Sequence, residues 1–179
     1  MGFLLLSGSA IALPTHAHAP SAPVPAGYSV TLTAYNAVPA QTDASPFETA
    51  SGAYSNPAVV AARSRNLASE LPFGTIIEID GSNISSQGTC GYSVVAQRIG
   101  YRVIADTMPA RYTDRIDILF DTQANYRTAD HGMQNAAGVL GICNNATTRV
   151  VGYVNINRIP ATQAELAALV RSGNSLALK

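Results

Sequence analysis

The chain has 179 residues, with 11 basic and 11 acidic side chains, a formal net charge of zero and 47% hydrophobic residues. The balanced charge argues against a nucleic-acid binder or a polybasic membrane-surface protein, because phosphate contacts require an excess of basic residues. A charged fraction of only 12% also excludes an intrinsically disordered chain, and the length predicts one domain with its own core.

The N-terminal segment is predicted to direct export. Met1–Leu13 is an apolar run with the length of a signal-peptide h-region, too short for a spanning helix of about 20 residues. Ala17-His18-Ala19 has the A-x-A form that a signal peptidase reads. We therefore expect residues 1–19 to be an export segment and residues 20–27 to be a Pro-rich linker. The mature protein would be periplasmic, secreted or associated with the cell wall, and without a spanning segment.

Two alternatives remain open for this segment. Pro20 is a poor residue directly after a cleavage site, so cleavage after Ala17 or Ala26 is also considered. A buried N-terminal helix is the other alternative, which the helix breaker Pro14 and the prolines of the linker disfavour.

The chain has two cysteines, Cys90 and Cys143, which are predicted to form a disulfide bond. In an oxidising compartment a lone pair of cysteines usually forms a bridge. Closing a loop of about 53 residues stabilises a protein by roughly 4 kcal/mol in the chain-entropy model. A metal site is disfavoured, because it needs about four ligands and only His131 lies beyond the export segment to join the cysteines.

Seven short segments have the pattern of β-strands, with alternating or continuous apolar residues between Gly, Pro, Asn and Ser turns. In chain order they are Tyr28–Tyr35, Val59–Ala62, Ile76–Ile79, Ser93–Gln97, Tyr101–Ala105, Ile116–Phe120 and Arg149–Ile156. This spacing predicts a small barrel or sandwich. Arg63–Leu71 and Thr122–Ala137 are expected to carry short helices.

The end of the chain, residues 157–179, is predicted to be a helical tail outside the β-rich unit. Thr162-Gln163-Ala164-Glu165 has the form of a capping box. Leu166, Leu169 and Val170 then give one apolar face, and Gly173 ends the helix. We expect this helix to pack on the surface of the β-rich unit in a structural role.

Two of the eleven acidic residues differ from the rest because they end or interrupt apolar strands. Asp106 follows the strand at 103–105, and Asp117 lies inside the strand at 116–120. Alternation along the strand places Asp117 with Leu119 on one face. Partial burial raises the pKa of a carboxyl group and suits it to act as a general acid near neutral pH.

Other arrangements have less support. The alternative to a catalytic role is that Asp117 binds a backbone amide of the turn between Arg111 and Arg115. His131 is interpreted as a loop or cap residue, since no serine has the G-x-S-x-G context of a nucleophile. The sequence contains no phosphate-binding glycine loop, H-E-x-x-H motif or calcium loop.

Five motifs occur in the order that is typical of the three-aspartate (3D) domain, and the chain resembles this family from about residue 28 to residue 156. The motifs are Thr33-Ala34-Tyr35, Thr49-Ala50-Ser51-Gly52, Leu71-Pro72-Phe73-Gly74-Thr75, Ala105-Asp106-Thr107 and Arg115-Ile116-Asp117-Ile118-Leu119-Phe120. The domain is found in membrane-bound lytic transglycosylase A and in stationary-phase survival proteins; rare lipoprotein A is a more distant likeness. The resemblance implies a mainly β fold, a six-stranded double-psi β-barrel over residues 28–156 with short helices and a C-terminal helix.

The resemblance also implies an enzyme that cleaves peptidoglycan glycan strands between N-acetylmuramic acid and N-acetylglucosamine. Asp117 would protonate the glycosidic oxygen and then accept the proton of the muramyl C6 hydroxyl as that oxygen closes on C1. Asp106 would lie beside it, orient the substrate and raise the pKa of Asp117. Thr49 and Ser51 would offer hydroxyl groups to the sugars. The resemblance implies no metal and no organic cofactor.

One element departs from the family pattern. The family's first aspartate is expected within residues 60–64, where Arg63 or Ser64 replaces it. An arginine at this place would lower the pKa of Asp117. Asp43 would either supply the missing carboxylate or form an Asx turn. The alternative functions are a non-catalytic peptidoglycan-binding barrel and a hydrolytic glycosidase that uses Asp117 with Asp43 or Asp106.

Overall fold

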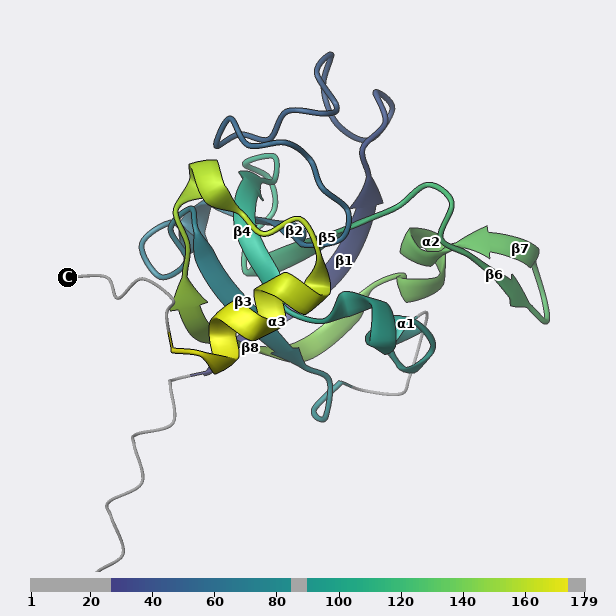
Figure 1. Ribbon diagram of the computed structural model, residues 1–179. Coiled ribbons are helices and arrows are strands. Elements are labelled where there is room, and N and C mark those ends of the chain that lie inside the picture. Colours follow the sequence, from purple (N-terminus) through teal and green to yellow (C-terminus); the bar gives the residue numbers. More distant parts are fainter. Residues whose placement is uncertain (1–26, 85–89, 174–179) are drawn as a thin grey trace, which may run out of the picture.

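The computed structural model describes residues 27–84 and 90–173, and its centre is a closed six-stranded barrel (Figure 1). The strands follow the order β1-β5-β2-β4-β3-β8 around the barrel. The predicted fold class, a mainly β, six-stranded double-psi barrel with short helices and a C-terminal helix, is confirmed. The barrel strands are β1 (Gly27–Asn36), β2 (Val60–Arg63), β3 (Thr75–Asp80), β4 (Arg102–Thr107), β5 (Arg115–Phe120) and β8 (Cys143–Tyr153).

The strand order brings together segments that are distant in sequence. β1 pairs in parallel with β5, and β2 pairs in parallel with β4, whereas the other neighbours in the barrel are antiparallel. β2 therefore lies between β4 and β5, with the two strands running in opposite directions beside it. The segment that connects β1 to β2 forms the dark blue loops above one end of the barrel in Figure 1.

Both faces of the central strands are buried. Ile104 in β4 and Ile118 in β5 belong to one apolar cluster, which also includes residues of the helices α1 and α2. Their neighbours Ala105 and Leu119 point the other way and belong to a second cluster, which the C-terminal helix completes. A polar side chain on either face of these strands is therefore shielded from water by apolar neighbours.

One buried cation joins the same strands. Arg102, at the start of β4, is 1% exposed, and its guanidinium group donates to backbone carbonyl oxygens. The acceptors include Ile99 at 2.6 Å, Pro57 at 2.8 Å, Leu119 in β5 at 3.1 Å and Val60 in β2 at 3.3 Å. Burial lowers the pKa of Arg102 to about 9. Because carbonyl oxygens of β2 and β5 accept from one guanidinium group at the start of β4, this side chain ties β4 to both strands.

The strand predicted at Ser93–Gln97 is wrong, because this segment lies in helix α1 (Tyr92–Ile99). Val95 and Ile99, four residues apart, are buried on one side of the helix, whereas Val94 is 53% exposed. A short apolar run does not distinguish a helix from a strand by its pattern alone. The helix ends at Gly100, whose positive φ of 55° favours glycine.

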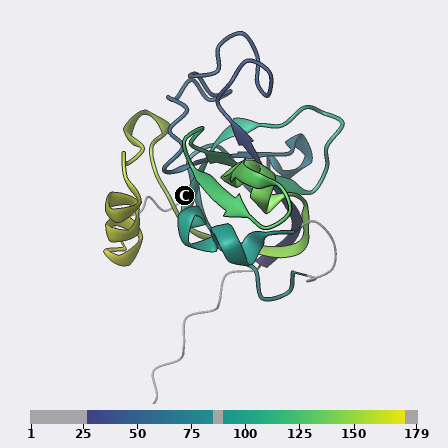
Figure 2. The same cartoon turned by 90° about the vertical axis from the view of Figure 1, so that its right-hand side faces the viewer.

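The helix predicted over Thr122–Ala137 is also wrong for most of its length. The segment forms a hairpin of β6 (Asn125–Thr128) and β7 (Gly132–Asn135), and only the start of α2 (Ala136–Leu140) falls within it. The turn of the hairpin leads into Gly132, the first residue of β7, which has a positive φ of 68°. It projects from the barrel in Figure 1 and faces the viewer in Figure 2.

Two further segments have different boundaries from those predicted. Arg63–Leu71 contains only the 3-10 turn η1 (Arg65–Leu67). The last barrel strand, predicted at Arg149–Ile156, begins earlier, at Cys143, and ends at Tyr153, before the 3-10 turn η2 (Ile156–Arg158).

The predicted C-terminal helix is confirmed as α3 (Gln163–Arg171), with both hydrogen bonds of its capping box. Leu166 is fully buried in the second apolar cluster. The side chain of Gln163 donates to the carbonyl oxygens of Ala58 at 2.6 Å and Tyr101 at 2.7 Å. The helix is thus fixed against the barrel, and Figure 2 shows it on a different side from the β6–β7 hairpin.

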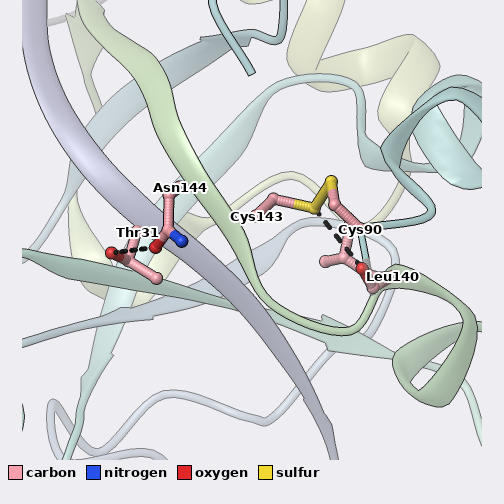
Figure 3. The surroundings of a disulfide bond; sticks show 5 residues. All are labelled: Thr31, Cys90, Leu140, Cys143 and Asn144. Carbon is pink, nitrogen blue, oxygen red and sulfur yellow. Dashed lines mark hydrogen bonds between the residues drawn. A yellow bond between two sulfur atoms is a disulfide. The ribbon is translucent and has the colours of Figure 1, made fainter. Parts of the chain in front are cut away.

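The predicted disulfide between Cys90 and Cys143 is present (Figure 3). Cys90 precedes α1 and Cys143 is the first residue of β8, with 4.9 Å between their Cα atoms. The bond therefore ties α1 to the barrel. The predicted export segment and linker fall on residues 1–27, nearly all outside the described residues. Within the described ranges, no helix is both long and apolar enough to cross a membrane.

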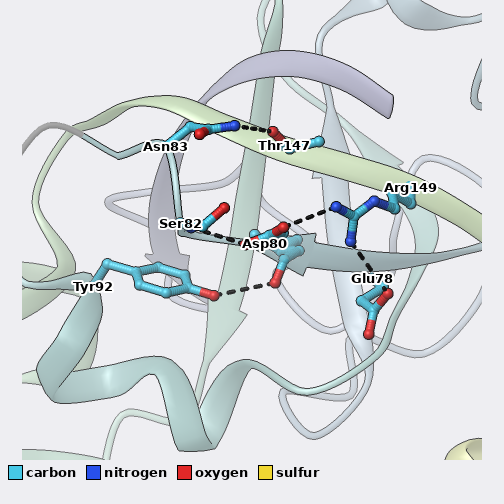
Figure 4. Close-up of polar contacts among 8 residues, drawn as sticks. Glu78, Asp80, Ser82, Asn83, Tyr92, Thr147 and Arg149 are labelled. Atoms are coloured by element: carbon cyan, nitrogen blue, oxygen red, sulfur yellow. Dashed lines mark hydrogen bonds and ion pairs between the residues drawn. The ribbon is translucent and has the colours of Figure 1, made fainter. Parts of the chain in front are cut away.

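A polar cluster lies between β3, β8 and α1 (Figure 4). Arg149 in β8 contacts Asp80 at 2.8 Å and Glu78 at 3.9 Å, both in β3. Tyr92 in α1 donates its hydroxyl hydrogen to the carbonyl oxygen of Ile79 at 3.1 Å. These contacts connect β3, β8 and α1 and are interpreted as structural.

The double variant Cys90→Ala/Cys143→Ala is expected to unfold with a free energy about 2–4 kcal/mol lower than the wild type, because the unfolded chain loses its loop constraint. Urea denaturation of both proteins measures the difference. Reduced wild-type protein, as the matched control, should unfold like the variant. Two alkylatable thiols in the folded protein before reduction would contradict the disulfide.

Candidate active site

The pairing of β2 aligns Asp106 and Asp117 on either side of Ala62. Ala62 is the register partner of Asp106 in the parallel β2·β4 pair and of Asp117 in the antiparallel β2·β5 pair. Thr33 in β1 is the next partner of Asp117. Paired residues point to the same face, so these four side chains form a row across four strands. Since neighbouring strands are about 4.8 Å apart, the Cα atoms of the two aspartates are about 10 Å apart.

A pocket of about 620 Å³ opens on this row, and we call it the Asp117 pocket. Barrel residues form one part of its wall, and the loops before β2 and after β4 form the other. The predicted site residues Asp43 and Thr49 line it, whereas Ser51 does not. Its lining residues are Tyr35, Gln41, Thr42, Asp43, Ser45, Pro46, Glu48, Thr49, Ala50, Ser55, Ala62, Arg65, Asp106, Thr107, Met108, Pro109 and Asp117.

Asp117 has the electrostatic properties of a proton donor. Burial raises the pKa of its carboxyl group, and the negative charge of Asp106 raises it further. The hydroxyl of Thr33, which donates to Oδ1 of Asp117 at 2.7 Å, and the nearby Arg115 lower the pKa. The resulting pKa is about 6. Near neutral pH this carboxyl group can therefore both give and take a proton.

Asp106 is held by three hydrogen bonds. Its Oδ1 accepts from the backbone amides of Thr107 at 2.8 Å and Ala50 at 2.9 Å, and its Oδ2 accepts from the Tyr35 hydroxyl at 3.0 Å. Burial and the charge of Asp106 raise the pKa of Tyr35, which keeps its hydroxyl a donor. Both oxygens of Asp106 are thus engaged. This suits Asp106 to fix the loop at Ala50 and to place a negative charge near Asp117, rather than to transfer a proton.

Thr49 and Ser51 use their hydroxyls mainly within this loop. Thr49 Oγ1 donates to the carbonyl oxygen of Ala53 at 2.9 Å and lies 2.9 Å from Ser51 Oγ. The amide of Ser51 donates to the carbonyl oxygen of Ala105 in β4 at 3.1 Å. Of the two predicted sugar-binding hydroxyls, only that of Thr49 belongs to a residue in the wall of the Asp117 pocket.

Further charged residues line the pocket. Asp43 forms the Asx turn that was the alternative to its catalytic role, since its Oδ1 accepts from the amide of Ser45 at 2.8 Å. Glu48 and Arg65 line the pocket and were missed from the sequence. Glu48 directly precedes the T-A-S-G motif, and this position could have identified it as a site residue. Arg65 has no comparable signal in the sequence, because only the tertiary structure brings it to the pocket.

The expected effect of Arg63 on the pKa of Asp117 is not found in the structure. The guanidinium of Arg63 donates to the carbonyl oxygen of Leu71 at 2.7 Å and covers the Phe73 ring, and it has no role in the pKa of Asp117. Ser64 Oγ accepts from the amide of Arg115 at 3.0 Å. The β2 residue between the aspartates is Ala62, so neither Arg63 nor Ser64 occupies the row.

In the parts of the chain that the structure describes, no group of three or more His, Cys, Asp or Glu residues is placed to hold a metal ion. His131 is exposed in the turn of the β6–β7 hairpin, where its amide donates to Thr128 Oγ1 at 3.2 Å. It is a loop residue, as its sequence context suggested.

Comparisons of this chain with protein-family models, curated proteins and solved structures found no match. The resemblance to the 3D domain therefore rests on the sequence motifs, and the function must be inferred from the geometry of the Asp117 pocket.

Asp117→Asn is expected to stabilise the protein at high pH but not at low pH. The folded-state pKa of about 6 exceeds the ordinary value of 3.8, so the stability that the protonated carboxyl contributes is complete below about pH 4. It is lost as the pH rises through 6. The variant should match the wild type at pH 4 and exceed it at pH 8 by about 1–3 kcal/mol.

Urea denaturation at both pH values measures this effect. Asp121→Asn is the matched control, because the exposed Asp121 accepts a hydrogen bond from the amide of Gln123 that asparagine can also accept. If the Asp117→Asn variant has the same free energy of unfolding as the wild type at pH 8, Asp117 is not a desolvated carboxyl group.

Proposed function

We propose that this protein is an exported lytic transglycosylase that cleaves peptidoglycan glycan strands between N-acetylmuramic acid and N-acetylglucosamine. The observation that carries the proposal is one carboxyl group, Asp117, with a pKa of about 6 in the wall of a pocket of about 620 Å³. Among the described residues Thr33 is its single hydrogen-bond donor, bound to Oδ1. The other oxygen, Oδ2, is then available for a substrate.

In the first half of the reaction, protonated Asp117 donates its proton to the glycosidic oxygen. The bond between this oxygen and C1 of the muramyl sugar breaks, and the leaving N-acetylglucosamine keeps the proton as a hydroxyl group. Positive charge develops at C1 and the ring oxygen. The negative charge of Asp106 near Asp117 would stabilise this transition state.

In the second half, the C6 hydroxyl oxygen of the same muramyl sugar bonds to C1. Its proton passes to the Asp117 carboxylate, which regenerates the acid form. The product is a 1,6-anhydromuramyl end, and no water is consumed. One residue that acts as acid and then as base suffices for this sequence, unlike the pair of carboxyl groups that an ordinary glycosidase needs.

The other charges of the pocket suit a decorated glycan. Asp43 and Glu48 are acceptors for sugar hydroxyl and acetamido hydrogens, and the hydroxyl of Thr49 retains acceptor capacity. Arg65 is a cation in a wall that is otherwise acidic, and it would attract the carboxylates of the muramyl peptides. The disulfide between Cys90 and Cys143 supports an oxidising compartment and hence export.

A hydrolytic glycosidase is the second candidate, favoured by the presence of Asp43 and Glu48 in the same pocket. Either carboxylate would activate a water molecule that attacks C1 while Asp117 protonates the leaving oxygen. Digestion in ¹⁸O-labelled water distinguishes the reactions, because only hydrolysis places the label in the new reducing end.

Purified sacculi treated with the wild-type protein should release fragments with 1,6-anhydromuramyl ends, identified by mass spectrometry. Asp117→Asn is expected to reduce their release at least about 100-fold, because the proton donor is lost. Asp121→Asn, the matched change at an exposed site, should leave it unaltered. A wild type that binds sacculi without releasing fragments would support the non-catalytic barrel instead.

The rate of cleavage should decline as the pH rises above 6, by about tenfold per pH unit, because the reaction begins from protonated Asp117. Thr33→Val removes the hydrogen bond that lowers the pKa of Asp117, so this decline should move to higher pH. The pH dependence of kcat/KM for both proteins measures the shift. An unchanged or lowered midpoint in the variant would contradict the role of Asp117.

A further inference from the structure

Two exposed aromatic rings lie on the loop beside the Asp117 pocket. Phe47 is 62% exposed and Tyr54 is 66% exposed. Their ring centroids are 6.5 Å apart and their planes differ by 16°, so the two rings are nearly parallel and stacked, with the outer ring faces open. Large aromatic side chains bury most of their surface in ordinary folds, and an exposed pair is therefore a feature to explain.

Backbone hydrogen bonds hold the loop that carries these rings. Glu48 and Tyr54 form an antiparallel bridge, and the amide of Ser55 donates to the carbonyl oxygen of Phe47 at 3.0 Å. Further along the loop, the amide of Ala50 is bound to Asp106 at 2.9 Å. The aromatic pair is thus connected to the carboxylate row through a short, hydrogen-bonded segment.

The loop that carries the rings lines two cavities. Glu48 and Ser55, each next to one of the aromatic residues, line the Asp117 pocket. Tyr54 and Asn56 instead line a second cavity of about 400 Å³, whose far wall is the segment from Ile156 to Ala161. A chain-like ligand that runs out of the Asp117 pocket across this loop would pass over the aromatic pair.

We propose that Phe47 and Tyr54 form a platform that binds a sugar ring of the glycan strand outside the Asp117 pocket. This inference rests on the proposed function for the identity of the strand. The face of a β-linked pyranose carries axial C–H bonds, whose partial positive charge matches the negative face of an aromatic ring. Flat, exposed and prepositioned rings bind such a face without the cost of ordering a flexible side chain.

The platform would bind the glycan strand at a second place, in addition to the Asp117 pocket. A glycan strand held on Phe47 and Tyr54 would be oriented before its scissile bond reaches Asp117. The platform would therefore favour strands long enough to reach both places over short fragments.

The chain contains no tryptophan, so Tyr54→Trp introduces a single fluorescent reporter at the platform. In the Asp117→Asn background, which removes the proton donor, soluble chitohexaose is titrated as the probe. We expect a saturable change in tryptophan emission. Met133→Trp, at a 64% exposed site on the β6–β7 hairpin, is the matched control and should not respond. No response from the tryptophan at position 54 would overturn the platform.

Calorimetry in the same background tests the contribution of the rings without a reporter. Phe47→Ala and Tyr54→Ala should each weaken chitohexaose binding about threefold to tenfold, whereas Phe47→Tyr should keep it. Met133→Ala removes a comparably exposed side chain and should have no effect. Because both rings are exposed, the variants are expected to fold, which thermal unfolding verifies. Equal affinities for all variants would overturn the platform.

These outcomes are distinct from those of the proposed function. A response of the position-54 tryptophan, with no release of 1,6-anhydromuramyl fragments by the wild type, would support the platform and refute the transglycosylase. The opposite result is that Phe47→Ala/Tyr54→Ala cleaves sacculi like the wild type and that the emission of the position-54 tryptophan does not change. This result would overturn the platform and would not contradict the transglycosylase.

Discussion

The site depends on the position of β2 between β4 and β5. Because Ala62 pairs with Asp106 on one side and Asp117 on the other, two aspartates from different strands occupy one row of the barrel. The small side chain of Ala62 lies between them in the pocket wall. The buried guanidinium of Arg102 donates to carbonyl oxygens of β2 and β5 from the start of β4, so it reinforces the same three strands.

The two aspartates differ because their surroundings differ. Asp106 uses both oxygens to hold Tyr35 and two backbone amides, one of them in the loop that carries Glu48 and the aromatic pair. Asp117 has a single donor and a pKa raised by burial. One carboxylate thus organises the loop that completes the pocket, while the other has a single hydrogen-bond donor among the described residues. This division of roles follows from hydrogen bonding and burial, since the two residues are chemically identical.

Alternation along the chain was sufficient to predict most barrel strands and the opposite orientation of Asp117 and its apolar neighbours. It failed for α1, where a short run around Val95 fits a strand and a helix equally well. It also failed for the β6–β7 hairpin, whose mostly polar side chains, exposed or half-buried, have no apolar periodicity. The capping box at Thr162 was recognised because all of its partners are within four residues. Sequence patterns therefore predicted those elements whose stabilising contacts join residues that are close in sequence.

Residue types and periodicity along the chain determined a mainly β fold, the disulfide partners and the candidate aspartates, whereas the choice of a barrel over a sandwich came from the order of the motifs. Only the tertiary structure decided that Ala62, rather than Arg63 or Ser64, stands between the aspartates, and that Glu48 and Arg65 share their pocket. Strand register and loop placement depend on contacts between segments far apart in sequence. A shift of one residue would turn Asp117 to the other face of its strand.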